Sequence, residues 1–232
     1  MQKRIIGIIG GMGPLATVDL FRKIVEQTDA SCDQEHIHIL IDNNTNIADR
    51  TTALIGGGAS PLPELQKSAE FLEQGGAQCL VMPCNTAHGF YEDVQKSVSI
   101  PVLNMISLTC NELLQQGITC AGLLATSGTI QTGVYEKYFH DIELIYPSDE
   151  EQPFVMDMIY GGVKAGKRNY DSSVVQRIAD HLLDRGAQCI ILGCTELPLA
   201  MELYHLKFPS IDPTLVLAKG AIAFALGTKQ LV

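Results

Sequence analysis

Two cysteines stand at matching places in a phrase that the chain contains twice. Residues 76–86 read GAQCLVMPCNT, and residues 186–196 read GAQCIILGCTE. In each copy an apolar run of strand length leads into a cysteine, Cys84 or Cys194, which polar residues follow. Such a run is typical of a buried parallel strand that delivers a side chain to a site at its carboxyl end. Two thiols on opposite sides of one carbon can remove a proton from one face and return one to the other, which is the chemistry of stereoinversion.

Other blocks of sequence repeat in the same order as the cysteine phrase. Residues 7–17 resemble residues 122–132, and residues 100–104 resemble residues 208–212, where we expect a short strand in each copy. Blocks that recur in one order at a near-constant offset indicate two homologous halves. If a pseudo-twofold axis relates the halves, the two cysteines face each other across a cleft.

The alternation of strand and helix patterns predicts an α/β fold of two similar domains. We expect each domain to be a mostly parallel sheet flanked by helices, with the active site in the cleft between them. The predicted first domain combines residues 1–105 with 213–232, and the second spans residues 106–212. An apolar helix from about Thr214 to Leu226 has no counterpart and is expected to pack back on the first domain. In the first predicted helix one stripe at helical spacing is formed by Leu15, Val18, Phe21, Ile24, Val25 and Thr28.

Charge and composition exclude several classes of partner. The 232 residues include 26 acidic and 16 basic side chains, a net charge of −10, which gives no positive surface for nucleic acid or an anionic membrane. No apolar run approaches the roughly 18 residues of a membrane span. The 7 cysteines lack the spacing of a zinc site and do not indicate a disulfide framework. We therefore expect a cytoplasmic protein that acts on a small molecule, and an anionic substrate requires cations close to it.

Polar residues near the cysteines are candidates for substrate binding. Asn85, Thr86 and Thr195 follow the cysteines at expected helix starts, where backbone amides can bind a carboxylate; simple helix capping is the alternative. The positive end of a helix is also expected to favour the thiolate form of both cysteines. Arg50 and Lys164 lie in polar or glycine-rich loops at the ends of elements, and solvated surface charges are the alternative for both.

Three further signals leave more than one interpretation open. His88 can neighbour Cys84 on a helix, or cap or fill the core. Glu196 can orient or protonate Cys194, or only favour a helix N-terminus. The glycine turn at residues 11–16 fits a dinucleotide-binding pattern, but the second half repeats the turn without these glycines, so they are expected to serve substrate approach and packing.

The motifs resemble those of the aspartate/glutamate racemase superfamily, and of its aspartate racemase branch in particular. The motifs are GGMGPLAT at residues 10–17, PCNTAH at 83–88 and GCTELP at 193–198. Glutamate racemases carry Asp-Ser in the first loop and His after the second Cys-Thr, where this chain has Gly-Met and Glu196. This departure argues against glutamate racemase proper.

The resemblance implies a racemase that needs no cofactor and assembles as a homodimer. Cys84 and Cys194 would be its two bases, with Arg50 and Lys164 around the substrate carboxylates. It also makes Met12 and Thr126, in the equivalent first loops of the two halves, candidates for lining the pocket.

We therefore expect racemisation of an acidic amino acid, aspartate first. One cysteine, as thiolate, removes the α-proton while the other, as thiol, delivers a proton to the opposite face. The alternatives are a racemase or isomerase of another amino acid or small carboxylate, such as glutamate, a broad range of amino acids or maleate. A non-catalytic binding protein for an acidic ligand is the alternative of another class, and the matched thiols argue against it because a binder has no use for them.

Overall fold

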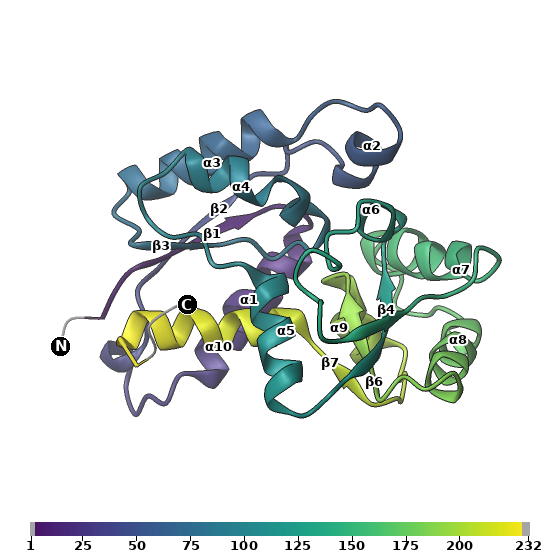
Figure 1. Cartoon of the computed structure of the whole chain (residues 1–232). Coiled ribbons are helices and arrows are strands. Elements are labelled where there is room, and N and C mark those ends of the chain that lie inside the picture. The colour runs from purple at the N-terminus through teal and green to yellow at the C-terminus, as the bar shows by residue number, and fades with distance from the viewer. Residues whose placement is uncertain (1–2, 229–232) are drawn as a thin grey trace.

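A computed structural model of the chain describes residues 3–228 and contains two parallel sheets flanked by helices (Figure 1). The first sheet has the order β2-β1-β3, and the second has the order β5-β4-β6-β7. The prediction of an α/β protein with two similar halves is therefore confirmed. The strands are β1 (Ile6–Gly10), β2 (Ile39–Asn43), β3 (Cys79–Val81), β4 (Cys120–Ala125), β5 (Glu143–Ile145), β6 (Cys189–Gly193) and β7 (Ser210–Ile211).

The two sheets repeat one topology, with β1 and β4 as equivalent central strands and β3 and β6 as the strands that lead to the cysteines. β7 corresponds to a single bridge between Leu80 and Val102, so the strand predicted at residues 101–103 is reduced to one contact. Side chains of the preceding helix α4 (Tyr91–Lys96) bond the backbone groups of Val102 that do not face β3. The amide of Val102 donates to Gln95 Oε1 at 2.8 Å, and its carbonyl accepts from the Tyr91 hydroxyl at 3.0 Å.

Helices connect the strands and cover both faces of each sheet. Those of the first half are α1 (Pro14–Gln27), η1 (Asp33–Glu35), α2 (Arg50–Ile55), α3 (Leu62–Gln74), η2 (Thr86–Phe90), α4 (Tyr91–Lys96) and α5 (Met105–Gln115). Those that follow are α6 (Ser127–Gln131), α7 (Gln152–Asp157), the π-helix η3 (Met158–Lys164), α8 (Ser173–Asp184), α9 (Glu196–Leu203) and α10 (Pro213–Leu226).

Helix α10 returns from the second half and packs against α1 and α5 (Figure 1). Its buried Leu217 and Ala218 share one apolar core with Ile6 and Ile8 of β1. These contacts support the predicted division into residues 1–105 plus 213–232 and residues 106–212. The division itself stays a prediction, and residues 1–2 and 229–232 lie outside the described part of the chain.

Helix α1 buries a different face from the one expected. Ile24 and Thr28 are buried as predicted, but Leu15, Val18, Phe21 and Val25 are 37% to 61% exposed. The inward face is formed by Ala16, Leu20 and Ile24, which recur every fourth residue and are fully buried. Beside them, buried Lys23 pairs with Asp19 on its own helix and with Asp212 Oδ2 at 2.6 Å, immediately before α10. Because a buried charge requires a partner, this contact supports the same rotation of α1.

Because α10 packs into the core, shortening a side chain on its buried face is expected to lower the free energy of unfolding strongly. Leu217 is fully buried, so Leu217→Ala should lower the free energy of unfolding by about 2–5 kcal/mol. Leu226 lies on the same helix and is 39% exposed, so Leu226→Ala should change it by about 0.5 kcal/mol or less. Urea unfolding followed by circular dichroism measures both, and equal losses would contradict the assignment of α10 to the core.

Candidate active site

The carboxyl ends of the strands in both sheets lead into one cavity. Met12 follows β1, Cys84 follows β3, Thr126 follows β4 and Cys194 follows β6. The full lining is Met12, Asp49, Arg50, Thr51, Cys84, Asn85, Thr86, Thr126, Tyr160, Lys164, Cys194, Thr195 and Glu196. The structure thus brings together all the residues that the sequence singled out for substrate binding and catalysis.

The cavity is small, and its two cysteines are almost fully buried. Its free volume is about 10 Å³, roughly the space of a single water molecule, and each cysteine is only 6% exposed. A wider hollow of about 320 Å³ adjoins it and shares Arg50, Lys164 and Glu196 with it. That hollow has the volume of a small-molecule site.

Arg50 lies at the start of helix α2 and not in the loop predicted for it, because the Asp49 carboxylate accepts from the Thr52 amide at 2.8 Å and caps this helix. The guanidinium is 8% exposed and donates to the carbonyl oxygens of Ala48 at 3.0 Å and Met12 at 3.2 Å. It also lies beside the Cys84 sulfur. Arg50 is therefore a buried cation at the cavity wall.

Two buried donors of the cavity have no hydrogen-bond partner within residues 3–228. They are Nε of Arg50 and Nδ2 of Asn85. The other end of the Asn85 amide is satisfied, because Oδ1 accepts from the Tyr135 hydroxyl at 2.7 Å. Buried donors without partners are costly and rare, so this pair indicates a place where the oxygens of a ligand bind.

His88 holds the backbone next to Cys84 in place, and both of its ring nitrogens are engaged with backbone groups. Its Nε2 accepts from the Met105 amide at 3.1 Å, so Nδ1 carries the proton and donates to the Cys84 carbonyl at 2.9 Å. Burial lowers the pKa of His88 to about 4. The neutral ring therefore ties the end of β3 to the start of α5, in agreement with the core interpretation of this residue.

Cys194 has a different neighbour from Cys84. Its thiol donates to Glu196 Oε2 at 3.0 Å, and Glu196 Oε1 lies 3.1 Å from Nζ of Lys164. Burial first, and the Glu196 carboxylate second, raise the pKa of Cys194 well above its usual value. The expectation that the helix end favours a thiolate is therefore wrong for Cys194, because burial and a carboxylate in contact together outweigh the partial charge of the helix.

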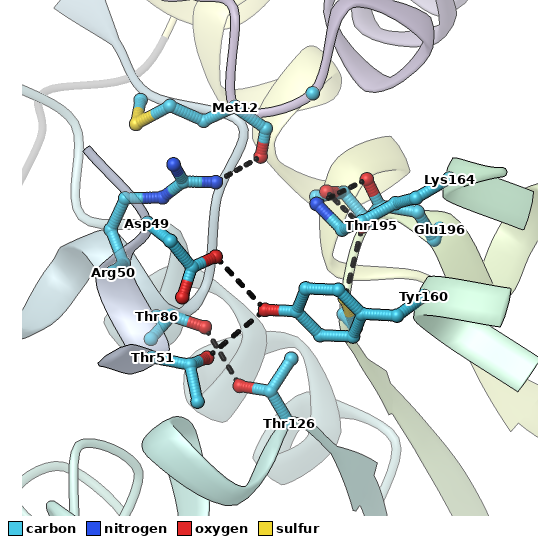
Figure 2. A network of polar contacts seen from close by, with 12 residues as sticks. Met12, Asp49, Arg50, Thr51, Thr86, Thr126, Tyr160, Lys164, Thr195 and Glu196 are labelled. Atoms are coloured by element: carbon cyan, nitrogen blue, oxygen red, sulfur yellow. Dashed lines mark hydrogen bonds and ion pairs between the residues drawn. The ribbon is translucent and has the colours of Figure 1, made fainter. Parts of the chain in front are cut away.

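Polar contacts join the two halves around the cavity, as Figure 2 shows. The Thr86 hydroxyl lies 2.9 Å from that of Thr126 across the halves. The Tyr160 hydroxyl, from η3, donates to Asp49 Oδ2 at 3.1 Å, before α2. The Lys164 ammonium also lies over the Tyr160 ring, 5.3 Å from the ring centroid.

Asp49, Thr51 and Tyr160 are the lining residues that sequence reasoning missed. A signal existed for two of them. Asp49 precedes Arg50 at a helix-capping position, and Tyr160 stands four residues before Lys164, a spacing that places side chains on one helical face.

Comparisons with known proteins agree with this geometry. Residues 9–221 match the family model for Asp/Glu/Hydantoin racemase. The chain belongs to the Asp/Glu/hydantoin racemase family. Membership makes it an amino-acid racemase, which is an isomerase, and confirms the superfamily that its motifs resemble. The likeness to aspartate racemase structures agrees with the aspartate racemase branch.

Two solved structures and one relative are similar to this protein over almost the whole length of the chain. Picrophilus torridus aspartate racemase has a TM-score of 0.79 and 31% identity, over 99% of this chain and 96% of that chain. An aspartate racemase homologue from Pyrococcus horikoshii OT3 has a TM-score of 0.76 and 27% identity, over 97% of this chain and 100% of that chain. The broad specificity amino-acid racemase RacX of Bacillus subtilis (strain 168) is 25% identical, over 94% of this chain and 96% of its own length.

The described residues offer neither a metal site nor a membrane-spanning helix. Across residues 3–228, no group of three or more His, Cys, Asp or Glu side chains is placed to hold a metal ion. In the same part of the chain, no helix is long and apolar enough to cross a membrane.

The unpartnered donors predict that a dicarboxylate without an amino group stabilises the protein. Succinate at about 100 times its Kd should add about 2.7 kcal/mol to the free energy of unfolding, measured as a rise in Tm. Arg50→Gln should lose most of this rise, whereas Arg168→Gln, which removes an exposed cation, should retain it. A rise that survives in Arg50→Gln would place the anion elsewhere.

Proposed function

We propose that the chain interconverts L- and D-aspartate without a cofactor, with Cys84 and Cys194 as the two acid–base groups. The observation that carries the proposal is one small cavity lined by both matched thiols, two cations and two unpartnered donors. The cations are Arg50 and Lys164, which a dicarboxylic amino acid can satisfy. The similarity to aspartate racemases over almost the whole chain supports the same substrate.

In this mechanism the bond to the α-hydrogen breaks toward one thiol and a new bond forms from the other. The Cys84 thiolate takes the α-proton, and the electron pair remains on the substrate as an enolate-like carboxylate. Arg50 and the Asn85 amide stabilise the added charge, and a donor of this kind lowers the barrier by roughly 3–4 kcal/mol. The Cys194 thiol then protonates the opposite face, and the roles reverse for the other enantiomer.

A broader substrate range is the second candidate, and the state of Lys164 favours it. Lys164 is paired with Glu196 at 3.1 Å, so the cation free to meet a substrate carboxylate is Arg50. A neutral amino acid has one carboxylate and needs one such cation. The similarity to a broad specificity racemase agrees with this alternative.

An enantiomer-resolved assay over the common L- and D-amino acids, without added cofactor, tests the proposal. We expect aspartate to be racemised fastest, and Cys84→Ala and Cys194→Ala each to lower the rate by about 10²–10⁴-fold. In deuterated water each variant should still exchange the α-proton of one enantiomer with retention, and the two should prefer opposite enantiomers. Activity only with added pyridoxal phosphate, or exchange of the same enantiomer by both variants, would reject the two-thiol mechanism.

We also propose that the enzyme is a cytoplasmic homodimer. Within the described residues all seven cysteines are free, which suits a reducing compartment. The exposed apolar stripe of α1, formed by Leu15, Val18, Phe21 and Val25, is a candidate contact between two copies. A helix face of this kind can meet its own copy across a twofold axis.

Light scattering after size exclusion tests the assembly. Wild type should have twice the mass of one chain, and the double variant Val18→Glu with Phe21→Glu should have the mass of a monomer, because two buried charges at the contact lack partners. Phe71→Glu alters a residue that is 63% exposed on α3 and should stay dimeric. A monomeric wild type would reject the proposal.

A further inference from the structure

The two cysteines of the cavity have neighbours of opposite charge. Cys84 lies beside the Arg50 guanidinium, whereas Cys194 donates its hydrogen bond to the Glu196 carboxylate at 3.0 Å. The repeated scaffold therefore carries an electrostatic difference between its halves. If the two thiols form an acid–base pair, this difference decides which of them holds a proton before a substrate binds.

Glu196 is held as an acceptor on both of its oxygens. Oε1 lies 3.1 Å from Nζ of Lys164, and the side chain is 3% exposed. Its two oxygens face the Lys164 ammonium and the Cys194 thiol, and a carboxylate held in an ion pair only accepts hydrogen bonds. The proton in its contact with Cys194 therefore belongs to the sulfur.

The other titratable groups around the sulfurs do not reverse this assignment. Lys164 acts on both cysteines but is already paired with Glu196. Tyr135 faces Cys194 as a neutral phenol, because burial raises its pKa well above the usual value. On the side of Cys84, the carboxylate of Asp49 is engaged in capping α2 and in accepting from the Tyr160 hydroxyl.

We propose that Glu196 is a positioning residue that keeps the proton on Cys194, so that Cys194 starts the reaction as the acid and Cys84 is left to act as the base. This inference rests on the proposed racemase function and adds a resting state to it. The enantiomer whose α-hydrogen points toward Cys84 meets an enzyme that is ready to react. Its mirror image requires the opposite protonation form.

The proton balance of one turnover follows from this resting state. Cys84 takes the α-proton, while Cys194 gives its proton to the opposite face of the same carbon. The enzyme is left with Cys84 as thiol and Cys194 as thiolate. To return, Cys84 releases a proton to solvent and Cys194 takes one from solvent. The product form is less stable because it places the Cys194 thiolate against the carboxylate of Glu196.

The unequal stability of the two forms has a kinetic signature. Because two enantiomers have equal free energies, kcat/KM must be the same in both directions. An enantiomer that binds only the rarer form has its KM raised by that rarity, so its kcat must be raised by the same factor. We therefore expect both kcat and KM to be larger for the enantiomer that Cys194 deprotonates.

Alkylation of the free enzyme with iodoacetamide, read by mass spectrometry of the two peptides, tests the resting state without a substrate. Cys84 should react at least about tenfold faster than Cys194, since the thiolate is the nucleophile and tenfold corresponds to one pKa unit. Glu196→Gln keeps the shape and removes the charge, so Cys194 should become more reactive. Glu202→Gln removes an exposed carboxylate from the same helix and should leave the ratio unchanged.

Equal rates in wild type, or a faster Cys194, would overturn the inference. If Glu196→Gln left the ratio of the Cys84 and Cys194 alkylation rates unchanged, the inference would be overturned as well. The difference in rate would then come from the access of the reagent to the two sulfurs. In turnover, Glu196→Gln should bring the kcat values of the two enantiomers closer together, with KM changing by the same factor. Biased alkylation without racemisation of any amino acid would reject the proposed function alone, and racemisation with equal alkylation would reject this inference alone.

Discussion

Parallel strands place their carboxyl ends at one edge of a sheet, and here the edges of two sheets face one cavity. β3 and β6 lead into Cys84 and Cys194, while the loops after β1 and β4 supply Met12 and Thr126. Helices α5 and α10 pack on each other and contribute to the cores of both halves, which holds the two edges in place. The site therefore depends on contacts far from the cysteines as much as on its own lining.

The repeat supplies two matched sulfurs, but their neighbours do not match. Arg50 comes from α2 of the first half, and Glu196 is the last residue of the second cysteine phrase. A symmetric scaffold suits a substrate carbon that must be approached from two faces. An asymmetric charge distribution suits a proton transfer, because at any moment one sulfur must be a base and the other an acid.

The sequence predicted the parts that repeat or follow a strand, and missed the parts that depend on tertiary contacts. The duplicated phrases placed Cys84 and Cys194 together because strand ends converge whatever the side chains are. The buried face of α1 was missed because the helix carries two apolar faces, and only tertiary contacts, including the ion pair of Lys23 with distant Asp212, show which one is buried. Tyr160 was missed because its contact with Asp49 joins the two halves. The protonation of Cys194 was missed although Glu196 is two residues away, because the sequence does not show how deeply the pair is buried.

The charges of so small a cavity also bear on which side chains it accepts. Glu196 is buried and pairs with Lys164, whose side chain is 23% exposed, and leaving a buried charge without its partner costs about 3–5 kcal/mol. A neutral side chain leaves this pair intact. A second carboxylate near Lys164 has to share the ammonium with Glu196, because displacing Glu196 would leave a buried carboxylate without a cation. The carboxylate that contacts the Cys194 thiol therefore also limits which charges the cavity admits.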